Sequence, residues 1–104
     1  MDDPSRGLEY AEKALAIAPK SGDVMDTLAT LLVALKREKE AHTWFQSAAN
    51  YAPNNPNIQF RFAKSAALAG DRERALEVVN DILAKFSKFQ ERKNAEKLRT
   101  TLAQ

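Results

Sequence analysis

The feature that most constrains this chain is the spacing of two prolines, each of which follows an alanine at the end of an apolar, helix-favouring segment. Pro19 and Pro53 lie thirty-four residues apart. Shifting the sequence by the same distance also aligns small residues with each other, for example Ala41 with Ala75. A fixed period of about 20 to 50 residues is typical of arrays in which each structural unit packs against the next. The spacing therefore predicts a solenoid of repeated units.

The composition agrees with a single all-α domain spanning residues 1–104. Hydrophobic residues make up 44% of the chain, and only three glycines and four prolines interrupt it. A length of 104 residues is enough for one compact core but too short for two. The net charge of +2 is too small to indicate a general binder of polyanions, so we interpret the basic segment 88–104 as a solvated helix face and expect no nucleic-acid partner.

Residues that stop helices, together with the spacing of apolar residues, predict about six helices. Pro19 and Pro53 stop two of them, and Gly70 suits the left-handed residue that often follows a helix end. Within the segments, apolar residues such as Leu28 and Leu32 recur at steps of three and four, which places them on one buried face. The predicted helices are 4–18, 23–36, 38–52, 56–69, 72–85 and 88–103.

These segments carry the residues by which a tetratricopeptide repeat is identified. Between residues 22 and 55 the signature positions hold Met25, Leu28, Ala29, Leu32, Ala41, Phe45, Ala48 and Pro53. From residue 56 onward the equivalents are Gln59, Phe62, Ala63, Ala66, Gly70, Ala75, Val79 and Ile82, and the first segment matches half a repeat through Gly7, Ala11, Ala14 and Pro19. The chain thus resembles the tetratricopeptide repeat family. The resemblance implies a right-handed superhelix of helical hairpins, with a half repeat at 4–19, a repeat at 22–55, a variant repeat at 56–87 and a capping helix at 88–104.

Two departures and one narrower similarity accompany this resemblance. Lys36 stands where a turn glycine is usual, and Gln59 replaces a large apolar residue. Segments 24–29 and 55–58 and the closing helix are similar to the C-terminal repeats of bacterial multi-repeat proteins associated with exopolysaccharide export and envelope protein sorting. The resemblance implies a non-catalytic scaffold that binds a protein or peptide.

In this family the first helix of each repeat lines a concave groove, which defines the candidate partner-binding residues. They are Asp23, Asp26, Thr30, Phe60, Arg61 and Lys64. One interpretation is that the charges are solvated or pair with each other, and that Phe60 packs inside the array. The other is that Arg61 and Lys64 hold an acidic peptide group while Phe60 is an apolar anchor. The family's chaperone-tail receptors have a lysine where this chain has Asp26, which argues against that partner.

The first helix has apolar residues on more than one side, which a single neighbouring helix does not cover. Leu8, Tyr10 and Leu15 form the candidate self-association edge. We expect either that the chain is the C-terminal fragment of a longer solenoid, with Met1 at a truncation point, or that it forms a homodimer through this helix.

The sequence gives no basis for catalysis. It has no cysteine and a single histidine, His42, which we interpret as a surface or packing residue because no triad or metal site can be built on it alone. We expect no catalytic, cofactor-binding or metal-binding residues. The acidic start and the lack of a long apolar run predict no signal or transmembrane segment in this chain and leave the compartment open between cytoplasm and periplasm. Trp44 and Tyr51 share one flank, either packed against the following repeat or forming an exposed aromatic strip.

Overall fold

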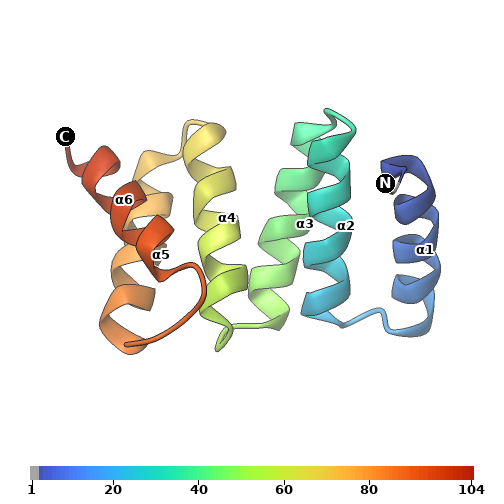
Figure 1. Ribbon diagram of the computed structural model, residues 1–104, viewed down its shortest axis with the longest axis horizontal. Helices are drawn as coiled ribbons and strands as arrows, with labels where there is room; N and C mark the ends of the chain where they lie inside the picture. Colours follow the sequence, from blue (N-terminus) through green and yellow to red (C-terminus); the bar gives the residue numbers. More distant parts are fainter. Residues whose placement is uncertain (1–2) are drawn as a thin grey trace.

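The computed structural model describes residues 3–104, which fold into an all-α array and confirm the predicted fold class. The helices follow one another along the long axis of the molecule, with the two termini at opposite ends (Figure 1). The longest dimension is 38 Å. The helices are α1 (Pro4–Ile17), α2 (Gly22–Ala34), α3 (Glu38–Tyr51), α4 (Pro56–Leu68), α5 (Arg72–Lys85) and α6 (Arg92–Ala103).

The contacts between helices define an inner and an outer side of the array. Consecutive helices pack against each other, which gives the hairpins α2–α3 and α4–α5. In addition the backbones of α2 and α4 and those of α4 and α6 approach closely, whereas within residues 3–104 the backbones of α1 and α3 and those of α3 and α5 stay farther apart. Helices on the inside of a curved array lie closer together than those on the outside. The inner side is therefore formed by α2, α4 and α6.

Polar side chains fix where most of the helices begin. The Ser21 hydroxyl accepts a hydrogen bond from the backbone N–H of Val24 at 3.2 Å and caps α2. Asn55 and Asp71 cap α4 and α5 in the same way, each accepting from backbone N–H groups of the first turn. Such caps satisfy N–H groups that have no partner inside the helix. Arg37, which precedes α3, makes no side-chain cap.

The inner helices α2 and α4 are each followed by a left-handed residue that reverses the chain. Lys36 has a φ of 61° and Gly70 a φ of 90°. The backbone N–H of Lys36 donates to the Val33 carbonyl at 2.9 Å, which closes the end of α2. The helix consequently ends at Ala34, two residues earlier than the sequence predicted, because Lys36 leaves the right-handed conformation.

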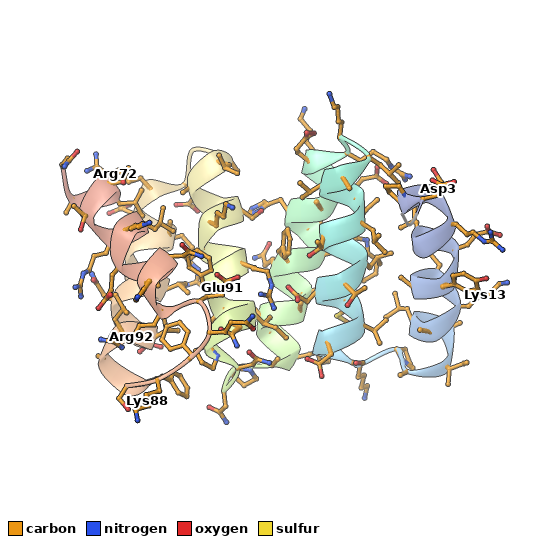
Figure 2. The ribbon with its side chains drawn as sticks, in the orientation of Figure 1. Asp3, Lys13, Arg72, Lys88, Glu91 and Arg92 are labelled. Atoms are coloured by element: carbon orange, nitrogen blue, oxygen red, sulfur yellow. The ribbon has the colours of Figure 1, made fainter. Side chains whose placement is uncertain are left out.

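The last helix also differs from the prediction, because it begins at Arg92 rather than at residue 88. Phe86 is extended, and the segment after it crosses toward α4, where the Asn57 side-chain oxygen accepts from the Glu91 backbone N–H at 3.0 Å. The Arg92 guanidinium donates to the Phe86 carbonyl at 2.7 Å. Figure 2 shows Lys88 in this connecting segment and Glu91 close to α4. The connection is held by side-chain hydrogen bonds that helical periodicity does not reveal.

The core runs through the whole array. Ile58, Val79 and Ile82 are the largest side chains that are fully buried, and the stripes predicted around Leu28 and Phe45 face inward. Small residues allow close approach: a Cβ on Gly22 would lie 2.8 Å from the Ala52 Cβ. Among residues 3–104, none of the helices combines the length and the apolar character required to cross a membrane.

Candidate functional site

A groove of about 700 Å³ lies between α2, α3 and α4, and we call it the α2–α4 groove. Its lining follows helical periodicity, so each helix contributes one face. The lining residues are Thr30 and Val33 from α2, Glu38, Lys39, Ala41, His42 and Phe45 from α3, and Arg61, Lys64, Ser65, Leu68 and Ala69 from α4 and its end.

The α2–α4 groove has a buried apolar floor and two exposed apolar walls. Ala41 and Phe45 in the floor expose 1% and 6% of their surfaces and belong to the core. Val33 on α2 and Leu68 on α4 expose 46% and 82%, which makes them unusual among the large apolar side chains of the structure. Concave sites with an apolar lining and a few polar groups are the usual sites of ligand binding in proteins. The groove therefore has the shape and lining of a binding site.

Arg61, which lines the groove, belongs to an ion-pair network. The Arg61 guanidinium donates to both carboxylate oxygens of Asp26, at 2.8 and 3.0 Å, and lies 3.3 Å from the Glu91 carboxylate. These hydrogen bonds to Asp26, together with the charges of Asp26 and Glu91, raise the pKa of Arg61 above its ordinary value against the opposing effect of burial. Arg61 therefore stays charged, and its charge is matched by carboxylates from α2 and from the start of α6.

A second polar contact joins the other two helices of the groove. His42 Nδ1 on α3 and the Ser65 hydroxyl on α4 lie 2.6 Å apart, in hydrogen-bonding distance. The imidazole also stacks on the Phe62 ring, with ring centroids 6.0 Å apart. Both polar residues are half-buried, and no hydrogen bond between residues 3 and 104 uses the other ring nitrogen of His42. This nitrogen is free to contact a bound molecule in the groove.

The structure separates the predicted partner-binding residues into two groups. Thr30, Arg61 and Lys64 line the α2–α4 groove, where a bound partner could contact them. Asp26 is buried in the contact with Arg61, and Asp23 lies exposed outside the groove lining. Asp26 and Arg61 pair with each other, as one interpretation of the sequence expected, whereas Lys64 does not take part in this pairing.

Phe60 packs inside the array, which is the first of the two interpretations of this residue, and it is not an exposed anchor. It exposes 5% of its surface and belongs to the core. It borders a smaller pocket of about 400 Å³ that is also lined by Leu98 of α6 and Glu91. The closing helix therefore covers this face of α4, and the ring supports the packing of α6.

The predicted edge on α1 is divided in a similar way. Leu8 is buried and Leu15 half-buried, and both border a pocket of about 310 Å³ that includes Trp44. Two of the three predicted edge residues are therefore covered within the chain, because α1 turns them toward α2 and α3. Tyr10 remains 60% exposed, together with Ile17 at 86%. Lys13 extends from the same outer side, 5.9 Å from the Tyr10 ring (Figure 2).

The position of Trp44 differs from both interpretations that the sequence offered for it. It lies half-buried on the side of α3 that faces α1, so it packs toward the preceding helices and not toward the following repeat. Tyr51 is half exposed. The two rings therefore do not form an exposed aromatic strip.

The sequence interpretation missed the contribution of α3 to the groove. His42 and Phe45 were assigned to the surface or the core, because the resemblance assigns the concave side to the first helix of each repeat. A usable signal was the spacing of Glu38, Ala41, His42 and Phe45, which places them on one helix face. Within residues 3–104 there is no group of three or more potential metal ligands.

Comparison with known proteins agrees with this architecture. The sequence model of the tetratricopeptide repeat matches residues 1–59, which is more than half of the chain. The chain therefore belongs to the tetratricopeptide repeat family. A search of curated proteins finds no matching relative. The family match ends within α4, so the helices that complete the array beyond it are described by the structure alone.

Proposed function

We propose that this chain is a non-catalytic interaction module that binds a segment of another polypeptide in the α2–α4 groove. Membership of the tetratricopeptide repeat family supports an interaction module, since such domains generally bind proteins or peptides. The observation that carries the assignment of the site is the pair of exposed apolar walls, Val33 and Leu68, above a floor formed by Phe45. Exposed apolar surface around a concave site is typical of interaction surfaces.

A peptide selection with matched variants tests this proposal. A random peptide library is selected against the wild-type chain, and the selected peptides are measured against L68E and I17E. Both positions are highly exposed helix residues, at 82% and 86%, so neither substitution is expected to disturb the core. The charge in L68E lies in the groove, whereas the charge in I17E lies on α1. We expect L68E to abolish binding and I17E to leave it unchanged.

The opposite pattern would favour the alternative of self-association through α1. If I17E abolished binding and L68E did not, the outer side of α1 would be the interaction surface. Assembly through this helix, a longer full-length solenoid and an envelope or polysaccharide-export system stay predictions from the sequence, and the covered positions of Leu8 and Leu15 weaken the first of them.

A further inference from the structure

The α2–α4 groove carries positive charge that no carboxylate of residues 3–104 neutralises. Lys39 in the first turn of α3 and Lys64 in α4 are both exposed and both line the groove. None of the ion pairs in this part of the chain includes either lysine. Arg61 differs, because Asp26 and Glu91 already hold its guanidinium. The charge that is available to a ligand therefore belongs to the two lysines.

The single acidic side chain in the lining does not cancel this charge. Glu38 is the first residue of α3, where the free N–H groups and the partial positive charge of the helix end stabilise a carboxylate. With Arg61 already paired, this one carboxylate stands against two lysines in the lining, so a net positive charge remains. Lys39 and Lys64 leave the open part of the groove electropositive, which complements an acidic ligand.

The apolar and basic parts of the groove lie close together. Lys64 and Leu68 are four residues apart on α4, so they are neighbours on one helix face, with Cβ atoms about 5–6 Å apart. Val33 forms the opposite wall from α2. A ligand that covers Leu68 therefore brings its neighbouring groups within reach of Lys64. In an extended peptide, which rises about 3.3 Å per residue, that distance corresponds to about one or two residues.

We infer that the α2–α4 groove recognises an acidic peptide motif in which a leucine, isoleucine or phenylalanine lies within about two residues of an aspartate or glutamate. The apolar side chain packs between Val33 and Leu68 over Phe45, and the carboxylate pairs with Lys64 and Lys39. This inference rests on the proposed function, because it specifies the chemistry of the peptide bound at the same site. Burial of the apolar side chain supplies most of the affinity, and the lysines select the charge of its neighbour.

Short labelled peptides of serine and glycine that differ only in their central pair provide the test. The pairs are Leu with Glu, Leu with Gln, Leu with Lys, and Ser with Glu, and binding is measured by fluorescence anisotropy. We expect the Leu–Glu peptide to bind tightest and the Leu–Gln peptide to bind about threefold to tenfold more weakly, as for exposed ion pairs. The Leu–Lys peptide should bind more weakly still, and the Ser–Glu peptide should not bind measurably. Added salt should reduce the difference between Glu and Gln.

Lysine variants locate the charge effect. K39Q and K64Q should each reduce the preference for Glu over Gln by about threefold, and the double variant should remove it. K20Q is the matched control, because Lys20 is exposed in the connection before α2 and lies outside the groove lining. It should leave the preference unchanged. The peptide series requires no variant, so it decides the inference even if a substitution affects folding.

The outcomes separate this inference from the proposed function. Equal binding of the Leu–Glu and Leu–Lys peptides would overturn the acidic motif, while binding that is sensitive to L68E would still support the groove. Selected library peptides that bind the groove but lack acidic residues would have the same meaning. If no library peptide showed sensitivity to L68E, the proposed function itself would fail. Competition by laurate at the concentration at which the Leu–Glu peptide binds would identify a small amphiphile as the occupant and overturn the inference.

Discussion

The hairpins α2–α3 and α4–α5 have the same architecture but use equivalent positions differently. Asp26 in α2 and Phe60 in α4 are thirty-four residues apart. Asp26 is bound to Arg61 of the next inner helix, whereas Phe60 is buried beside α6. In both cases the following inner helix or the segment leading to it covers the position. The neighbouring helix, and not the position in the repeat, therefore determines which side chains stay available to a partner.

The turns of the two hairpins differ in a similar way. Lys36 and Gly70 occupy equivalent left-handed positions, and only the glycine adopts this conformation without a steric cost. The next residue is Arg37 in one hairpin and Asp71 in the other. Asp71 caps α5 through the Arg74 N–H, while Arg37 makes no cap and instead forms an ion pair with Glu40. The turn between α4 and α5 therefore fits its backbone conformation and caps the next helix better than the turn between α2 and α3.

Truncating equivalent core residues of the two hairpins should give the largest loss of stability, and it tests whether the hairpins form one core. Leu28 and Phe62 are equivalent residues and each exposes 3% of its surface. We expect L28A and F62A each to lower the free energy of unfolding by about 2–5 kcal/mol through lost burial and the resulting cavity. Urea denaturation measures this effect. An unchanged dependence on urea would indicate one cooperative core, whereas a second transition in either variant would show that the hairpins unfold separately.

Removing the carboxylate of Asp26, which pairs with Arg61, should give the next largest loss of stability. In D26A, the partly buried guanidinium of Arg61 loses its main partner, so we expect the free energy of unfolding to fall by about 1–3 kcal/mol. D23A is a suitable control because Asp23 is exposed on the same helix and takes part in no ion pair of residues 3–104. An equal effect of the two substitutions would show that the contact with Arg61 does not stabilise the fold.

Exchanging the turn residues gives a smaller effect of opposite sign in the two hairpins. K36G should raise the free energy of unfolding by about 1 kcal/mol, because it removes a left-handed non-glycine residue. G70A should lower it by about the same amount, and since no atom lies near the added Cβ, the cost would come from the backbone alone. Thermal unfolding of both variants tests this pair. A stabilising G70A would contradict the assigned backbone conformation.

The smallest effect is a pH dependence that comes from the ion pair between Arg37 and Glu40 in the first hairpin. The hydrogen bond from Arg37 lowers the pKa of Glu40 below its ordinary value. A lowered pKa in the folded state stabilises the fold above the unfolded pKa, and this contribution is lost as the pH falls through the folded pKa. E40Q should therefore be slightly less stable than the wild type at neutral pH and equally stable in strong acid. Denaturation at both pH values measures this, and a difference that persists in acid would contradict the ionic origin.

The sequence predicted the helices and most of the core because these depend on periodicity and on local punctuation. Pro19, Pro53 and Gly70 mark ends that the structure confirms within a few residues. It also indicated that Gln59 departs from the family, and the structure supplies the reason: its amide donates to the carbonyls of Ala49 and Ala52 at the end of α3, at 2.7 and 3.2 Å.

The binding surface was predicted less well, because it depends on contacts between helices that are distant in sequence. The covering of Phe60 by α6 and the pairing of Asp26 with Arg61 both involve residues more than thirty positions away. His42 and Ser65, whose contact brings α3 into the groove, are also well separated in the sequence. Lys64 is exposed in the groove lining, where the sequence placed it, and its role in binding stays a prediction.

Mapping the bound peptide by nuclear magnetic resonance is the most direct test of whether a partner binds in the α2–α4 groove. Backbone amide signals of the isotope-labelled chain are followed during titration with the Leu–Glu peptide. We expect the largest changes around Val33, His42 and Leu68, with little change on α1. Changes centred on Tyr10 and Ile17, with the groove signals unmoved, would contradict it.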